Sequence, residues 1–158
     1  MTQYNIIAES QEYTVVAEFD HVATPAEAYQ SEADLEKEFI RLLGEQGYEY
    51  LPIHKEADLI FNLRDQLEKL NHYHFTDNEW EHFFNECIAN KNDDIVAKTA
   101  KIQDDYIQVL KRDTGESQNI KLIDKDNIHN NFVQVINQYV EEGGNYDTRY
   151  DVSILVNG

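Results

Sequence analysis

The sequence predicts an α/β fold, a mixed sheet with flanking helices that is incomplete at one strand. Amphipathic helical patterns recur between residues 31 and 103, and β-prone runs dominate the last third of the chain. The length of 158 residues, with 41% hydrophobic side chains, is enough for one domain with a core. The two prolines and six glycines exclude collagen-like and low-complexity classes.

The N-terminal third predicts a strand, a helix and a second strand. Residues 13–17 are rich in β-formers. The helix is expected to begin after Ser31, a good N-cap residue, and to end at Gly47. Its apolar stripe consists of Leu35, Phe39, Leu42 and Leu43. Residues 48–51 then alternate as a strand that Pro52 stops.

Three helices are expected in the middle of the chain. The first spans residues 56–71, with its apolar face formed by Leu59, Leu63, Leu67 and Leu70. The second begins at residues 76–79, whose sequence Thr-Asp-Asn-Glu is a capping box. A shorter third helix is expected over 93–101, with Asp93 as its cap.

The last third changes from helical to strand periodicity. Residues 106–110 and 120–123 flank the turn sequence at 113–116, which predicts a β-hairpin. Residues 132–136 continue the strand pattern, although the same run is also compatible with a helix. A Gly-Gly pair at 143–144 is expected to interrupt this pattern.

The C-terminal run, residues 150–156, is strongly β-prone and is followed by Asn157 and Gly158. Asn-Gly after such a run is a strong hairpin signal, but no returning strand follows. A terminal strand with an unpaired edge is an aggregation hazard that natural domains avoid. We therefore expect the chain to be a fragment of a longer protein.

Charge and composition narrow the function classes. The 31 acidic and 13 basic side chains give a net charge of −18, which argues against a protein that simply coats DNA or membranes. No apolar run is long enough to span a bilayer, and the first residues have no secretory signal pattern. A single cysteine, Cys87, fits a reducing, cytoplasmic setting.

Two acidic residues are candidates for chemistry. Asp151 stands near the start of the last β run, where aspartate is uncommon, and could be a Mg²⁺ ligand presented by a sheet. The alternative is an exposed acid at a strand end. Glu36 lies beside the apolar stripe of the first helix, and its alternative is one of many solvated helix acids.

Other reactive residue types favour structural interpretations. His72, His74 and His82 do not show a spacing typical of a zinc site, so solvent-facing or capping roles are favoured. Cys87 as a nucleophile is disfavoured because neighbouring Glu81 and Glu86 would raise the pKa of its thiol. The sequence contains no GxxxxGK[ST], GxGxxG or GxSxG motif.

Several stretches resemble a known family. They are residues 29–36 running on to 46–49, residues 145–158, and the shorter stretches 8–10 and 122–124. In this order they are similar to the start of the R (restriction and motor) subunit, HsdR, of type I restriction–modification enzymes. The sequence Arg-Tyr-Asp-Val followed by Leu-Val-Asn-Gly within 149–158 is the most specific part of the resemblance.

The resemblance implies a PD-(D/E)xK-type, Mg²⁺-dependent DNA endonuclease. In that motif an Asp begins one strand of a hairpin and Glu-x-Lys lies on the next strand. Asp151 matches the Asp, as a catalytic residue and metal ligand, and Glu36 matches the helix acid of related nucleases. The chain ends at Gly158 before any Glu-x-Lys, so we expect a truncated nuclease domain that cannot cut DNA alone.

The resemblance also implies an assembly. Residues 1–158 would be the N-terminal part of the nuclease domain, with 56–103 a helical insertion. ATP would be used by motor domains outside this chain. DNA would be bound through the full subunit, and the methyltransferase and specificity subunits would be its partners, with no membrane.

A second hypothesis comes from a different class. A domain of this size with a net charge of −18 could be a complete, small acidic binding protein, either a DNA mimic or an interaction module. No spacing of the acids in the sequence demonstrates a phosphate-like arrangement.

Overall fold

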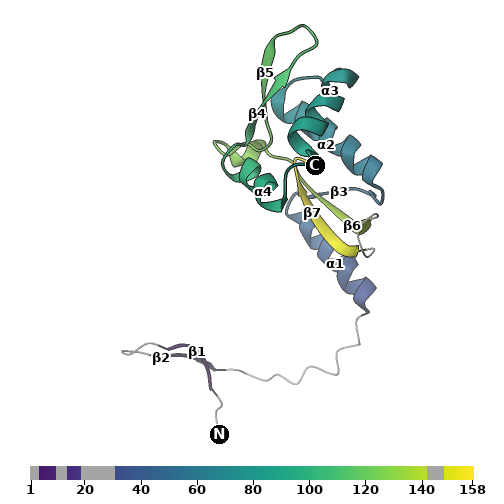
Figure 1. Cartoon of the computed structure of the whole chain (residues 1–158). Coiled ribbons are helices and arrows are strands. Elements are labelled where there is room, and N and C mark those ends of the chain that lie inside the picture. Colours follow the sequence, from purple (N-terminus) through teal and green to yellow (C-terminus); the bar gives the residue numbers. More distant parts are fainter. Residues whose placement is uncertain (1–3, 10–13, 19–30, 142–147) are drawn as a thin grey trace. The chain divides into compact units, whose positions relative to one another are not determined.

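The computed structural model describes residues 4–9, 14–18, 31–141 and 148–158 (Figure 1). These residues belong to two compact units, residues 1–32 and residues 33–158. The Gly-Gly pair predicted to interrupt the strand pattern, and the first residue of the predicted strand 13–17, lie outside the described residues.

The first unit contains a β-hairpin. β1 (Tyr4–Glu9) pairs antiparallel with β2 (Thr14–Glu18). The register shifts between Ile6 and Ala8, as at a β-bulge, where one strand takes an extra residue. The strand predicted at 13–17 is confirmed for residues 14–17, whereas its partner β1 was not predicted.

A three-stranded mixed sheet organises the second unit. β6 (Val133–Glu141) is central, with β3 (Glu49–Tyr50) parallel on one side and β7 (Thr148–Val156) antiparallel on the other. The strand alternative for residues 132–136 is therefore confirmed, and so is the mixed α/β class. Among the described strands, β7 forms an edge of this sheet.

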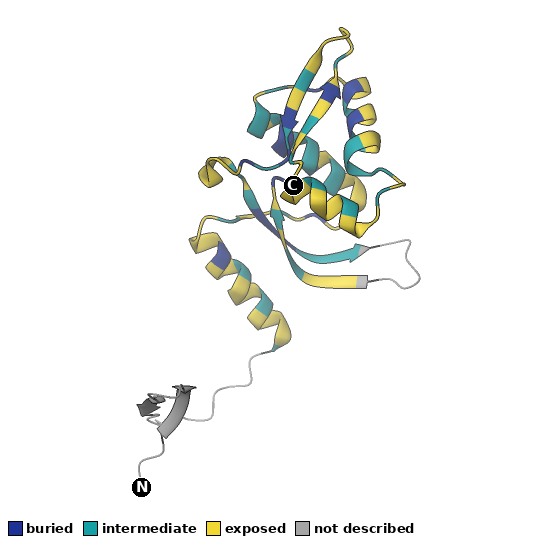
Figure 2. Ribbon diagram, turned by 60° about the vertical axis from the view of Figure 1, so that its left-hand side comes forward, coloured by how far each residue is buried: buried dark blue, intermediate teal, exposed yellow. Residues whose placement is uncertain are grey.

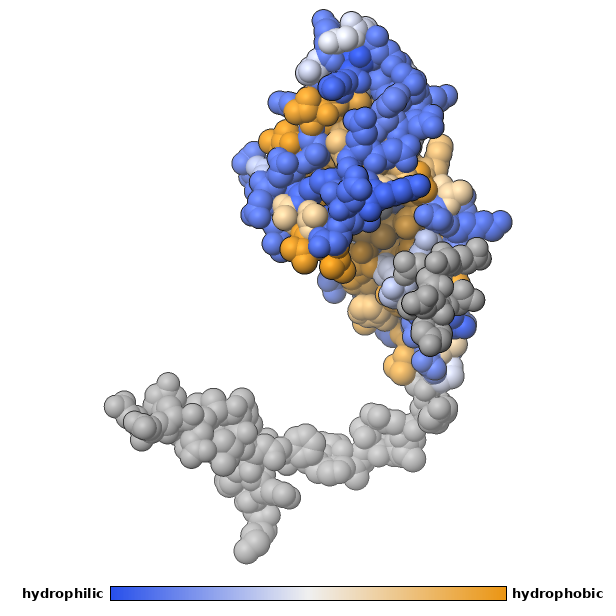
Figure 3. All heavy atoms as spheres, in the orientation of Figure 1, coloured by the Kyte–Doolittle hydropathy of each residue, from blue (hydrophilic) through white to orange (hydrophobic). Residues whose placement is uncertain are grey.

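Helix α1 (Glu32–Glu45) begins directly after Ser31, as predicted. Gly47 follows the helix with φ +93°, a left-handed conformation that favours glycine at a helix end. Of the predicted apolar stripe only Leu43 is buried. Leu35, Phe39 and Leu42 are 54%, 47% and 41% exposed, and apolar side chains are visible at the surface toward this end of the unit (Figure 3).

The middle of the chain is helical, as predicted. Its elements are α2 (Glu56–Asn71), α3 (Asp77–Phe83), the π-helical turn η1 (Phe84–Ile88) and α4 (Ile95–Gln103). The predicted bounds of α2 are confirmed. The cap predicted for the third helix was wrong by one residue: Asp94 accepts from the backbone of Ala97, whereas Asp93 pairs with Lys101.

The predicted hairpin is confirmed, with β4 (Ile107–Lys111), β5 (Ser117–Lys121) and Gly115 at φ +87° in the turn. The second strand begins three residues earlier than predicted and ends two residues earlier. Its inner face packs on α2 and α3 in a cluster of buried residues: Leu67, Phe75, Phe83, Leu110, Ile120 and Leu122. Figure 2 shows this buried core between hairpin and helices. Each such side chain contributes about 1.5–3 kcal/mol by its burial.

Asparagines connect the sheet, the helices and the hairpin. Asn71 Nδ2 donates to Lys121 O at 2.9 Å, and Lys121 N donates to Asn71 Oδ1 at 2.7 Å, which ties α2 to β5. Asn157, 1% exposed, accepts from Phe132 N at 2.8 Å and donates to Leu122 O at 3.1 Å. Asn157 therefore joins the end of β7 to the segment around η2 (Ile128–Asn130).

Gly158 lies against the backbone of α2. A Cβ at this position would stand 2.4 Å from Leu63 Cα, and φ is +87°. Asn157 has φ +57°. Asn157 and Gly158 therefore have the positive φ values of the two central residues of a type I′ turn. This agrees with the hairpin signal of an Asn-Gly pair after a β run.

Glu79 ties the start of α3 to the β4–β5 turn. The predicted capping box is confirmed, because Glu79 N donates to Thr76 Oγ1 and Thr76 N donates to Glu79 Oε2. The same carboxylate, 3% exposed, accepts from Tyr73 Oη at 2.8 Å and from Asp113 N at 3.0 Å. Burial raises the pKa of Glu79, but these hydrogen bonds outweigh it and leave that pKa below its ordinary value.

In the described part of the chain, no helix is long and apolar enough to cross a membrane.

Replacement of Glu79 by Gln should destabilise the 158-residue chain by about 2 kcal/mol at pH 7, because a buried, multiply bonded carboxylate is lost. Since the folded pKa of Glu79 is lowered, its contribution is present at neutral pH and is lost as the pH falls through that value. Denaturant unfolding at pH 7 and pH 3 measures both effects.

The matched control is Glu81→Gln, an exposed acid on the same helix, which should change stability little. An equal loss at both pH values for the Glu79 variant would contradict the assigned role.

Candidate acidic site on the β6–β7 sheet

Glu36 is held by two neighbouring amides of the central strand. Asn137 Nδ2 donates to Glu36 Oε1 and Gln138 Nε2 donates to Glu36 Oε2, each at 2.6 Å. Glu36 belongs to α1 and is half-buried. Both oxygens of this carboxylate therefore have fixed partners, in contrast to the solvated helix acid that was the alternative.

The paired contact depends on an unusual backbone at Gln138. In a regular strand, consecutive side chains point to opposite faces, so Asn137 and Gln138 would not meet the same carboxylate. Gln138 has φ +53°, a left-handed conformation that is rare outside glycine. The ladder nonetheless keeps its register, with Asn137 opposite Val152 and Tyr139 opposite Tyr150. The positive φ thus redirects one side chain without adding a residue.

Asp151 lies on the edge strand β7 between Tyr150 and Val152, at the position that the β6–β7 ladder skips, since Gln138 and Asp151 are not paired. Its side chain is 64% exposed, and its Oδ1 is 4.0 Å from Arg149 Nε. An ion pair this exposed contributes little to stability. The exposed-acid interpretation and the metal-ligand interpretation both predict an accessible carboxylate, so exposure alone does not distinguish them.

The contacts of the structure do not join the two predicted site residues. Asn137, which donates to Glu36, is paired with Val152, and Asp151 is the next residue on β7, so regular alternation turns its side chain to the other face of the sheet. Among the described residues, no group of three or more His, Cys, Asp or Glu side chains is arranged to hold a metal ion.

Tyr50 orients one of the amides. Tyr50 Oη donates to Asn137 Oδ1 at 2.9 Å, which leaves the amide nitrogen of Asn137 facing Glu36. Sequence reasoning missed Tyr50, Asn137 and Gln138. The signal was a pair of amides inside a β run, where asparagine is depleted, but the bonds themselves depend on how α1 and β3 meet β6.

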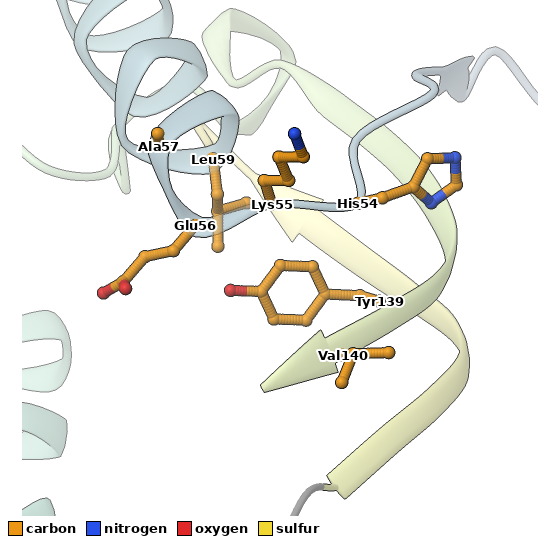
Figure 4. Close-up of a pocket in the computed structure, with 7 residues that line it drawn as sticks. All are labelled: His54, Lys55, Glu56, Ala57, Leu59, Tyr139 and Val140. Atoms are coloured by element: carbon orange, nitrogen blue, oxygen red, sulfur yellow. The ribbon is translucent and has the colours of Figure 1, made fainter. Parts of the chain in front are cut away.

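An open cleft of about 630 Å³ lies nearby, between the start of α2 and the end of β6 (Figure 4). It is lined by His54, Lys55, Glu56, Ala57, Leu59, Tyr139 and Val140. The Tyr139 ring lies opposite Leu59 and Glu56, whereas His54 points away from it. The cleft combines one acidic side chain, two basic side chains and apolar walls, and its lining includes neither Glu36 nor Asp151.

His72, His74 and His82 are all exposed, which agrees with the solvent-facing or capping roles that were favoured. His72 caps α2 in a left-handed conformation with φ 50°. His74 Nδ1 lies 2.5 Å from Glu68 Oε2, and the His74 side chain is 85% exposed.

Cys87 is half-buried beside the core cluster. Burial is the largest cause that raises the pKa of its thiol, Lys101 lowers it, and Glu86 raises it. The predicted rise in the pKa of the thiol and the contribution of Glu86 to it are confirmed, whereas the contribution of burial was not predicted.

Comparison with known proteins identifies the family. Residues 29–158 match the family described as type I restriction enzyme R protein N terminus. The chain is 43% identical over 153 residues to the type I restriction enzyme EcoprrI endonuclease subunit of Escherichia coli, covering 96% of this chain and 49% of that protein. The chain belongs to the type I restriction enzyme R protein family, in which it corresponds to the N-terminal region.

Two staphylococcal proteins are also similar. The SsaAORF53P endonuclease subunit of Staphylococcus saprophyticus is 35% identical over 135 residues, and the SauMSSORF170P subunit of Staphylococcus aureus strain MSSA476 is 34% identical over 136 residues. These alignments cover 82% and 83% of this chain but 14% of each relative. The chain therefore spans about half of the E. coli relative and a small part of the staphylococcal ones.

The raised pKa of Cys87 predicts slow modification. At pH 7 the folded chain should react with a disulfide reagent such as DTNB more slowly than the same chain in denaturant, because little thiolate is present and the sulfur is partly covered. Stopped-flow absorbance measures both rates. Equal rates in the folded and unfolded chain would contradict this environment.

Proposed function

We propose that this chain forms part of a Mg²⁺-dependent PD-(D/E)xK nuclease domain, in which Asp151 is a metal ligand and Glu36 is the helix acid. The observation that carries the proposal is that Asp151 is an exposed carboxylate on an edge strand, which is followed by residues with the φ values of a type I′ turn. The relatives are named as endonuclease subunits of type I restriction enzymes, which supports the same class of reaction.

The geometry of β7 supports a hairpin whose second strand would carry Glu-x-Lys, the second half of the motif. Asn157 and Gly158 have the φ values of a type I′ turn, and β7 is an edge strand among those described. A strand returning from this turn would pair with β7 and carry Glu-x-Lys next to Asp151. It would also protect an edge that otherwise invites aggregation.

The chain's own residues fit a hard cation in part. Asp151 is accessible and would hold Mg²⁺ directly. Each carboxylate oxygen of Glu36 already accepts a hydrogen bond from a side-chain amide. When bound, Mg²⁺ supplies activation of water and stabilisation of charge on the scissile phosphate. Glu36 would accept a hydrogen bond from a water in that site, and the Glu-x-Lys residues would complete it.

The wider function follows from the family. ATP-dependent translocation would come from motor domains outside this chain, and methyltransferase and specificity subunits would complete a DNA-cleaving complex in defence against foreign DNA. Residues 56–103 would be a helical insertion in the nuclease domain. The exposed stripe of α1 would be covered by the remainder of that domain.

Replacement of Asp151 by Asn in a full-length R subunit, assembled with its partner subunits, should lower the rate of DNA cleavage by roughly 100-fold or more, because a metal ligand is lost. ATP hydrolysis and translocation should be unchanged. Asp126→Asn, which alters an 81% exposed acid elsewhere, is the control and should cleave normally. Normal cleavage by the Asp151 variant would refute the assignment.

The 158-residue chain alone should neither cut nor tightly bind DNA. It contributes one of the three motif residues, and its net charge of −18 repels phosphate. A plasmid-nicking assay with Mg²⁺ and a mobility-shift assay at physiological salt test this. Metal-dependent nicking, or binding below about 1 μM, the tight side of nonspecific DNA binding, would overturn the prediction.

A further inference from the structure

The hydrogen bonds around Glu36 form a continuous chain across three elements. Tyr50 of β3 donates to Asn137 of β6 at 2.9 Å, and Asn137 donates to Glu36 of α1 at 2.6 Å. Gln138 completes the contact on the second carboxylate oxygen at 2.6 Å. With both oxygens bonded to the sheet, the carboxylate cannot rotate freely about its last torsion.

The backbone conformation of Gln138 indicates that the hydrogen bonds around Glu36 are kept at a local cost in conformational free energy. A left-handed conformation is unfavourable for glutamine, and such residues persist where the surrounding structure determines them. The ladder has the same register on both sides of Gln138, although Gln138 itself has no partner in it. The distorted residue instead places its side chain against Glu36.

We propose that Tyr50, Asn137 and Gln138 are positioning residues that fix the orientation of the Glu36 carboxylate as the helix acid of the nuclease site. This inference rests on the proposed nuclease function. The groups act through Glu36, which in turn would accept from a water of the site, so their loss should affect the use of Mg²⁺ before it affects folding.

The test compares Gln138→Gly and Tyr50→Phe in the full-length R subunit, assembled with its partner subunits. Glycine accepts the left-handed backbone, so the first variant removes the side chain without new strain. Phenylalanine removes only the hydroxyl group that orients Asn137. Tyr48→Phe removes a hydroxyl two residues away in the same segment and is the matched control.

DNA cleavage is measured as a function of Mg²⁺ concentration, which separates the maximal rate from the Mg²⁺ requirement. Gln138→Gly should raise the half-maximal Mg²⁺ concentration, or lower the maximal rate, by about 10-fold or more. Tyr50→Phe should have a smaller effect in the same direction, and Tyr48→Phe none. In a Glu36→Ala background, neither variant should add a further loss, because both act through that carboxylate.

The thermal unfolding of the 158-residue chain and its variants is measured alongside the DNA cleavage rates. Gln138→Gly should unfold no earlier than the parent chain, because the glycine relieves an unfavourable conformation. If this variant fails to fold, Tyr50→Phe alone decides. Normal Mg²⁺ dependence and rate in the folded variants would overturn the positioning role.

The two proposals fail in different ways. Loss of cleavage in Asp151→Asn, with normal cleavage in Gln138→Gly and Tyr50→Phe, would remove the positioning role and leave the nuclease assignment. Normal cleavage in Asp151→Asn would remove the nuclease assignment itself.

Discussion

Amide side chains on the central strand β6 must find hydrogen-bond partners, and this requirement connects the sheet to both flanking helices. Gln134 is 1% exposed, accepts from Asn62 of α2 and donates to Glu49 of β3, each at 2.9 Å. Asn137 and Gln138 make the corresponding contacts toward α1. A buried amide without partners costs more free energy than its hydrogen bonds contribute. The polar residues of β6 thus help to determine where α1 and α2 lie against the sheet.

Local signals in the sequence predicted the elements that depend on neighbouring residues. The bounds of α2 follow from its leucine spacing, and the start of α3 follows from the box at Thr76 and Glu79. The turn at Gly115 likewise follows from a short-range pattern, although β5 begins three residues before the predicted strand. The sequence could not decide whether Asp93 or Asp94 caps α4, because Asp93 forms an ion pair with Lys101 of that helix.

The candidate site was predictable only in part. Asp151 and Glu36 were proposed from strand composition and family resemblance, but the contact of Glu36 with Gln138 could not be read from sequence. It joins residues about a hundred positions apart and involves a backbone conformation that favours glycine, and neither leaves a local pattern. The acidic composition was equally ambiguous. Several acids serve as internal acceptors, as Glu79 and Asp124 do, rather than as a charged surface.

The bonds of Asn157 have a consequence for strand slippage. Asn157 exchanges hydrogen bonds with Phe132, in which its backbone N–H donates and its side chain accepts, at the last position where β7 runs beside β6. If β7 slipped by one residue, every side chain along it would move to the other face of the sheet. Asp151 would then turn away from its present side of the ladder. A buried amide at the far end of the strand therefore selects the face on which the acid is displayed.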